Sequence, residues 1–298
     1  MNYKQIEEEL AGLQDLKTIM ITYQEIAASR MQRVKDSVLR NRRFLDEVRE
    51  IYLELRTSYR AELSKILDRR KKTDDAQDYS ILTHSNQSVT VLLSSNTKLY
   101  GDIINKTFKR FLDEVKSKET DIVIVGKVGL QMYKTSDVNK EYTFFDLSDG
   151  IKDDETVHKI IEAFKSYKEI SVIHGKFENI LNQQADETIV STENAFEKTA
   201  EADTEEGDQP AMTRYLFEPS LEEILLFFET EILAALLEQT VYESNLSKFT
   251  SRMISLDKTV DNINQEVTKT KFRERQYKHR QIKQKHLDSL AGITLWNS

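Results

Sequence analysis

The stretch Leu225–Val267, "LLFFETEILAALLEQTVYESNLSKFTSRMISLDKTVDNINQEV", carries two series of positions that repeat every seven residues. The first series is Leu225, Ile232, Gln239, Leu246, Met253, Val260 and Val267, and the second is Phe228, Ala235, Tyr242, Phe249, Leu256 and Ile263. Only Gln239 is polar. This pattern is typical of a coiled-coil contact face. It predicts a long helix that begins near Ser220, a suitable N-cap.

A second long helix is predicted at the other end of the chain. Residues 3–70 contain no proline and one glycine, so helix breakers are almost absent. Apolar residues recur with heptad spacing at Ile6, Leu13, Met20, Ala27 and Val34, with a second series at Leu16 and Tyr23. Each helix has one apolar face, and the simplest partner for each is the other. We therefore expect a long antiparallel coiled coil.

The middle of the chain has a different character. Short β-branched runs, typical of strands, occur at Ser88–Ser95, Asp121–Lys127, Tyr167–Lys176, Glu187–Ser191 and, more weakly, Thr213–Phe217. Helical spacing occurs between them at Leu99–Val115 and Glu155–Tyr167. This alternation predicts a small Rossmann-like α/β domain with a mostly parallel sheet. The expected division is an N-terminal helix over 1–72, an α/β domain over 73–219 with an acidic flexible loop at 197–209, and a C-terminal helix over 220–298.

Composition excludes several classes of chemistry. The 298 residues include no cysteine, which excludes disulfides, thiolate metal sites and cysteine nucleophiles. The five histidines have no metal-ligand spacing, and no serine lies in a nucleophile-elbow pattern. No run approaches the roughly 18 apolar residues of a membrane span, so any membrane role is expected to be peripheral. We expect no catalytic, metal-binding or cofactor-binding residues in this chain.

The most suggestive phosphate motif is also weak. The run "IVIVGKVGLQMY" follows a predicted strand and contains Gly126 and Gly129. It lacks the third glycine of the dinucleotide fingerprint and the spacing of a P-loop. The favoured interpretation is a strand that turns into a loop, without a nucleotide.

A basic segment, Thr268–Lys285 ("TKTKFRERQYKHRQIKQK"), stands out in a chain of net charge -8. Glu274 is its only acidic residue. Three interpretations stay open from the residues alone: a solvated helix face, a nucleic-acid-binding arm, or an end that docks into an acidic protein partner.

Four strings in order resemble those of one family. They are "IMITYQEIAASRM" (Ile19–Met31), "SNTKLYGD" (Ser95–Asp102), "FEPSLEEIL" (Phe217–Leu225) and "RMISLDKTVDN" (Arg252–Asn262). Together with the architecture they resemble the gamma subunit of F-type ATP synthases. The departures include Lys98 and Asp102 where the family has glycines, and Lys278 and His279 where it has an Arg-Gln pair.

The resemblance implies a rotating central stalk that couples ion flow through the c-ring to ATP synthesis or hydrolysis on the alpha/beta hexamer. The implied partners are the alpha and beta subunits, the epsilon subunit and the c-ring of the membrane sector, with no nucleic acid. It implies a non-catalytic subunit, without a cofactor, at the cytoplasmic face of a bacterial plasma membrane. The alternative is a free-standing coiled-coil adaptor or nucleic-acid-binding protein.

The resemblance also implies three groups of site residues. Contacts of the shaft with the alpha/beta ring are expected at Arg30, Arg33, Arg252, Lys278, His279, Arg280 and Lys283. The coiled-coil seam is expected to include Met20, Tyr23, Ala27, Leu246, Phe249, Met253, Leu256 and Val260. The part of the α/β domain that follows its first strand is expected to use Ser95, Leu99 and Gly101.

Overall fold

The computed structural model describes residues 3–59, 85–149, 154–179, 182–190, 218 and 220–296. Its helices are α1 (Tyr3–Ser58), α3 (Ile103–Ser117), α4 (Lys127–Lys134), α5 (Asp154–Phe164) and α7 (Leu221–Trp296). Its strands are β1 (Ser85–Leu93), β2 (Asp121–Val125), β3 (Thr143–Phe145), β4 (Tyr167–Phe177) and β5 (Gln183–Val190). The predicted acidic loop at 197–209 and the weak strand at Thr213–Phe217 lie outside the described residues.

The chain divides into two compact units, to both of which α1 and α7 contribute. One unit consists of residues 1–29 and 252–298, and the other of residues 30–251. Helix α7 begins as predicted, because the Glu223 N–H donates to the Ser220 hydroxyl over 3.2 Å.

In the unit of residues 1–29 and 252–298, α1 and α7 form an antiparallel pair. The Tyr3 hydroxyl donates to Glu274 over 3.3 Å, and the Gln24 amide donates to Asp257 over 3.1 Å. The α1 residue later in the chain, Gln24, pairs with the α7 residue that is earlier in the chain, Asp257. The two helices therefore run in opposite directions. Ile6, Ala27, Leu256 and Ile263 are buried in this unit.

In the unit of residues 30–251 the same two helices are again antiparallel. The Tyr52 hydroxyl donates to Glu229 over 3.0 Å. Farther along, the Asn41 side chain donates to the Ala235 carbonyl (2.9 Å) and to Gln239 (3.2 Å). Gln239, the one polar position of the predicted series, therefore takes part in a polar contact between the helices. Polar contacts of this kind specify the register of a coiled coil. The predicted antiparallel pairing of the two long helices is confirmed.

A five-stranded sheet forms the centre of the same unit, in the order β3-β2-β1-β4-β5. Strand β1 pairs in parallel with β2 and β4, and β2 pairs in parallel with β3, whereas β5 is antiparallel to β4. The predicted mostly parallel sheet is therefore confirmed.

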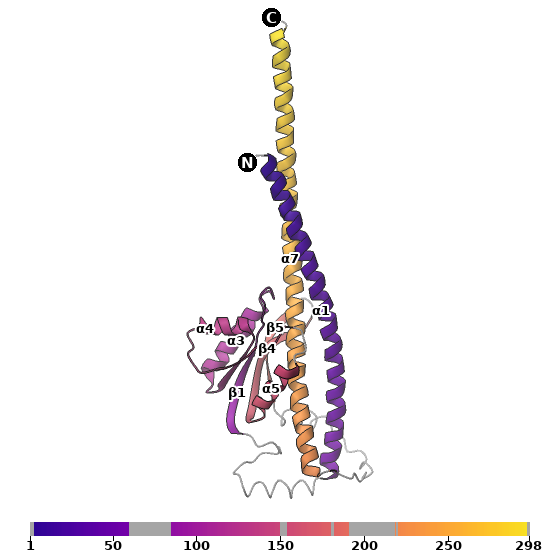
Figure 1. Ribbon diagram of the computed structural model, residues 1–298, viewed down its shortest axis with the longest axis vertical. Helices are drawn as coiled ribbons and strands as arrows, with labels where there is room; N and C mark the ends of the chain where they lie inside the picture. The colour runs from indigo at the N-terminus through magenta and orange to yellow at the C-terminus, as the bar shows by residue number, and fades with distance from the viewer. Residues whose placement is uncertain are drawn as a thin grey trace. The chain divides into compact units, whose positions relative to one another are not determined.

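Helices cover both faces of this sheet. Helices α3 and α4 lie on one face, where Phe108, Phe111 and Tyr133 pack with Leu92 and Ile124. Helix α5 lies on the other face (Figure 1), where α7 also contributes to the core. The residues of this second core include Val89, Val91, Ile160, Phe164, Leu233 and Leu237. Because Val91 and Leu92 are adjacent yet belong to opposite cores, β1 alternates as a strand covered on both sides should.

The structure corrects one local prediction. The loop predicted after Gly126 is wrong, because Lys127–Lys134 form α4. Gly126 has φ of 101°, which only glycine adopts easily, and this turn redirects the chain from β2 into the helix. Gly129 and Tyr133 lie four residues apart and are both buried on the face of α4 that meets the sheet.

Candidate functional site

The carboxyl ends of the parallel strands are the usual ligand site of a doubly wound sheet. Ligands enter the crevice where neighbouring connections leave in opposite directions, here between β1 and β4. In this chain α7 lies against that edge. A Cβ added at Gly175, near the end of β4, would lie 2.9 Å from the Ser247 hydroxyl. The chain's own helix therefore occupies the place of a ligand.

The amino end of α4, where a phosphate would bind in a nucleotide site, is also occupied. The Lys127 N–H donates to the Asn96 side-chain oxygen over 2.9 Å, and the Val128 N–H donates to the Ser95 carbonyl over 2.9 Å. A Cβ at Gly126 would lie 2.8 Å from the Ser95 backbone nitrogen, so the two loops touch directly. This geometry argues against a nucleotide at this position.

The loop that follows β1 holds three predicted site residues. Ser95 is fully buried, and its hydroxyl donates to the Thr97 carbonyl over 2.9 Å. Leu99 has a left-handed φ of 73° and is 66% exposed, which is an unusual combination for a large apolar residue. Gly101 also has positive φ, 64°. The loop therefore presents Leu99 at its surface and buries Ser95 beneath it.

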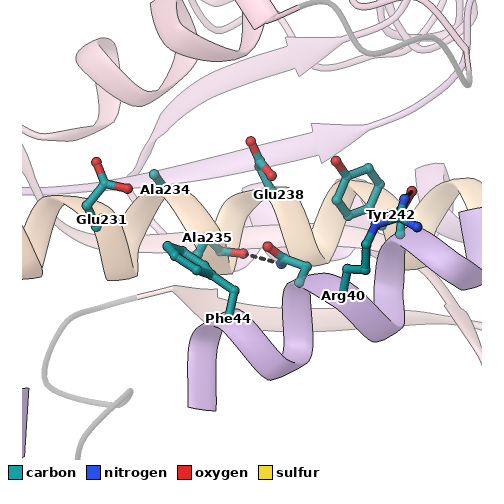
Figure 2. Close-up of a pocket in the computed structure, with 9 residues that line it drawn as sticks. Arg40, Phe44, Glu231, Ala234, Ala235, Glu238 and Tyr242 are labelled. Carbon is teal, nitrogen blue, oxygen red and sulfur yellow. Dashed lines mark hydrogen bonds between the residues drawn. The ribbon is translucent and has the colours of Figure 1, made fainter. Parts of the chain in front are cut away.

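A surface groove in the unit of residues 30–251 lies between α1 and α7 (Figure 2). Its volume is about 390 Å³. Arg40 and Phe44 come from α1, and Glu231, Glu238 and Tyr242 come from α7. The dashed bond in Figure 2 ends on the Ala235 carbonyl, which accepts from Asn41. The groove therefore flanks the polar contact between the two helices.

His174, on β4, is a buried histidine that the sequence did not assign to a role. One ring nitrogen lies 3.1 Å from the Gly175 carbonyl and the other 2.9 Å from the Thr188 hydroxyl. Burial lowers the pKa of His174 from 6.5 to about 4, so the ring is neutral at pH 7. Its contacts join β4 to β5, which is a structural role.

The basic segment of α7 begins beside the start of α1. The Lys278 ammonium lies 2.6 Å from the Glu274 carboxylate and 5.4 Å from the centre of the Tyr3 ring. Tyr3 also stacks on Tyr277 with ring centres 5.9 Å apart. The hydrogen bond with Glu274 raises the pKa of Lys278, and the same bond lowers the pKa of Glu274. Glu274, the only acid of the segment, therefore already has a cation as its partner.

Past this contact, α7 is exposed on all sides. Every residue from Lys278 to Leu290 is exposed, including the predicted contacts His279, Arg280 and Lys283. Successive helical residues are about 100° apart around the axis, so Lys278 and Lys285 point to one side and Arg280 and Lys283, three residues apart, point to the opposite side. The positive charge is therefore spread around the helix rather than gathered on one face.

The remaining predicted shaft contacts lie on both helices. The Arg30 guanidinium lies 5.9 Å from the centre of the Phe249 ring, Arg33 is exposed and Arg252 is half-buried. Within each unit, the predicted seam residues differ in burial. Ala27, Leu246, Phe249 and Leu256 are buried, whereas Met20, Met253 and Val260 are half-buried. Tyr23 is 47% exposed and lies outside the buried face.

The described residues form neither a metal-binding cluster nor a membrane-spanning helix. In the parts of the chain that the structure describes, no three His, Asp or Glu side chains are grouped so that they could hold a metal ion. None of the described helices is both long and apolar enough to cross a membrane.

The family model described as "ATP synthase" matches residues 2–292. An ATP synthase gamma chain of Ruthia magnifica is 22% identical over 282 residues, which cover 90% of this chain and 90% of that protein. The chain belongs to the ATP synthase gamma chain family. Another gamma chain, from Flavobacterium johnsoniae, is 24% identical and covers 88% of this chain and 87% of its own length.

A solved structure agrees with this fold. The Tetrahymena thermophila mitochondrial ATP synthase central stalk and c-ring structure contains a chain that matches with a TM-score of 0.52 at 15% identity. The match covers 81% of this chain and 99% of that one.

Family membership confirms the function expected from the resemblance. A gamma subunit of ATP synthase is a non-catalytic subunit of the central stalk, the rotor of the F1 sector. The filled crevice at the sheet edge is consistent with this role, because a stalk subunit transmits movement and needs no nucleotide of its own. The alternative of a free-standing adaptor or nucleic-acid-binding protein is not favoured.

Proposed function

We propose that the basic segment of α7, with Arg30, Arg33 and Arg252, is the surface through which this gamma-family chain contacts the ring of alpha and beta subunits. The observation that carries the proposal is the exposed run Lys278–Leu290, in which cations point to opposite sides of the helix. A partner that surrounds the helix can meet such a surface on both sides. A partner on one side could use only part of it.

The electrostatics suit contacts that form and break repeatedly. Exposed charges attract a partner over about 10 Å at moderate salt and contribute to orientation more than to tight binding. An acidic loop on each beta subunit, as the family resemblance implies, would complement Lys278, Arg280 and Lys283. Repeated release would then need little energy.

In this proposal the α/β domain, residues 73–219, is the foot that contacts the epsilon subunit and the c-ring. The two long helices, within 1–72 and 220–298, form the shaft. Leu99 supports a contact role for the loop after β1, because it is apolar, 66% exposed and held at positive φ. The complex would lie peripherally at the cytoplasmic face of a bacterial plasma membrane, in keeping with the bacterial gamma chains that this chain resembles.

The test has two stages. First, the full chain should co-purify with alpha and beta subunits when the three are expressed together. Second, the triple variant Lys278→Glu, Arg280→Glu and Lys283→Glu should reduce ATP-driven rotation of the assembled complex several-fold, since it replaces attraction by repulsion.

A matched control keeps the same change in net charge. Lys35, Arg43 and Lys258 are exposed cations of α1 and α7 outside the basic segment, and their reversal to Glu should leave rotation close to wild type. Failure to co-purify would overturn the assignment of partners. Equal rotation by wild type and the Lys278, Arg280 and Lys283 variant would overturn the role of the basic segment.

A further inference from the structure

Asp149 follows β3 in the chain and reaches the loop that follows β1. One oxygen of its carboxylate, Oδ2, accepts the backbone N–H groups of Asn96 and Thr97, each over 2.9 Å. The same oxygen accepts the Thr97 hydroxyl over 3.0 Å. Consecutive backbone N–H groups that converge on one point form an anion-binding concavity. Here the anion is a side chain of the same protein.

Lys248 on α7 approaches the other carboxylate oxygen. Its ammonium lies 3.6 Å from Asp149 Oδ1 and donates to the Ser94 carbonyl over 2.9 Å. The side chains of Lys248 and Asp149 are only 7% and 6% exposed. Burial lowers the pKa of Lys248, an effect that the charge of Asp149 opposes. A buried ammonium of this kind needs a buried anion beside it.

A second carboxylate near the same loop, that of Asp146, differs from Asp149 in its exposure and in its partners. Asp146 is 46% exposed and pairs with the exposed Lys127 over 2.8 Å. It accepts from the Asn96 side chain over 2.6 Å. The Asn96 and Thr97 backbone N–H groups donate to Asp149 and not to Asp146. Asp146 therefore provides a matched control on the same loop.

We propose that Asp149 is a built-in anion that fills an oxyanion-binding site made by the Asn96 and Thr97 backbone N–H groups, the Thr97 hydroxyl and Lys248. When the Asp149 carboxylate is removed, the site binds a small free carboxylate in its place. Through Lys248 the site connects the carboxyl edge of the sheet to α7 within the unit of residues 30–251. This explains why a lysine can lie at a buried position of α7. The proposal does not depend on the partners of the chain.

Chemical rescue of the full chain tests the site. Asp149→Ala should lower the midpoint of thermal unfolding by roughly 5–10 °C, since it leaves the Lys248 ammonium buried without its partner. Sodium formate, which replaces the missing carboxylate, should then raise the midpoint in a saturable manner. Sodium chloride at the same ionic strength should raise it much less.

Two further variants separate an anion site from general stabilisation. Asp146→Ala should lower the midpoint only slightly and show no difference between formate and chloride. Asp149→Ala combined with Lys248→Met should lose the formate response, because the cation of the site is gone. If formate and chloride act equally on Asp149→Ala, or if the double variant keeps the formate response, the proposal is wrong. Neither result bears on assembly with alpha and beta subunits.

Discussion

The Tyr52 hydroxyl donates a 3.0 Å hydrogen bond to the carboxylate of Glu229, which is 1% exposed, and so connects α1 to α7. Tyr52→Phe removes this donor and keeps the ring. Hydrogen bonds to charged groups contribute about 1.5–3 kcal/mol, so the free energy of unfolding should fall by that amount. Chemical denaturation of the full chain measures the change.

Tyr23 provides the control for this substitution, because it lies on α1 and is 47% exposed. Tyr23→Phe should change the free energy of unfolding by less than about 0.5 kcal/mol. A loss of equal size in both variants would mean that the bond between Tyr52 and Glu229 is not the cause.

Two glycines should respond to alanine in opposite ways. At Gly126, φ is 101° and a Cβ would lie 2.8 Å from the Ser95 nitrogen, so Gly126→Ala should cost on the order of 3 kcal/mol. At Gly12, in α1, a Cβ would meet none of the described atoms within 4 Å. Gly12→Ala should stabilise by about 0.5–1 kcal/mol, because alanine favours the helix. Thermal unfolding of the two variants should therefore shift in opposite directions from wild type.

Stability should depend on pH through His174. Burial holds the folded pKa of His174 at about 4, below the ordinary histidine value of 6.5. Between these values the unfolded chain binds a proton that the folded chain does not, so stability is full above pH 6.5 and falls as pH drops towards 4. The loss from this residue should reach about 3 kcal/mol.

Denaturation at several pH values checks this expectation. Wild type should lose more stability between pH 7 and pH 4.5 than His174→Gln does. His158, whose side chain is 74% exposed on α5, is the matched position, and His158→Gln should keep the wild-type pH dependence. Parallel curves for wild type and His174→Gln would contradict the prediction.

Phe249 is fully enclosed where α7 meets the loop after β1. Its ring contacts Tyr100 edge-on, with centres 6.0 Å apart, and lies below Arg30. Phe249→Ala should cost about 3–5 kcal/mol, as expected for a large buried ring. Phe272 on the same helix is 60% exposed, so Phe272→Ala should be nearly neutral. The denaturant midpoints of the two variants measure this difference, and similar midpoints for both would contradict the prediction.

The heptad pattern predicted the long helices because one face of each is apolar throughout. It did not predict the second face of α7, which packs on the α/β domain. Lys248 lies between the seam positions Leu246 and Phe249, where a lysine would ordinarily face solvent, yet it is buried. The available signal was the series of small residues Ser244, Ser247 and Ser251, whose spacing of three and four places them on one face.

Sequence patterns could not predict two other features, strand β3 and the role of Asp149. Strand β3 has only three residues, Thr143–Phe145, too few to show alternation. Asp149 carries no local signal at all, because its role depends on backbone N–H groups about fifty residues earlier in the chain. Such contacts arise from the fold, and only the topology brings them together.

Helix α7 changes from buried on every side at Ser244–Ser251 to exposed on every side at Lys278–Leu290. Since the chain contains no cysteine, a single introduced thiol would be the only one available for labelling. A thiol in place of Lys283 would accept a fluorophore without disturbing any packing. A thiol in place of Ser247 would be shielded from reagents, so its reaction rate would report directly how often α7 separates from the sheet.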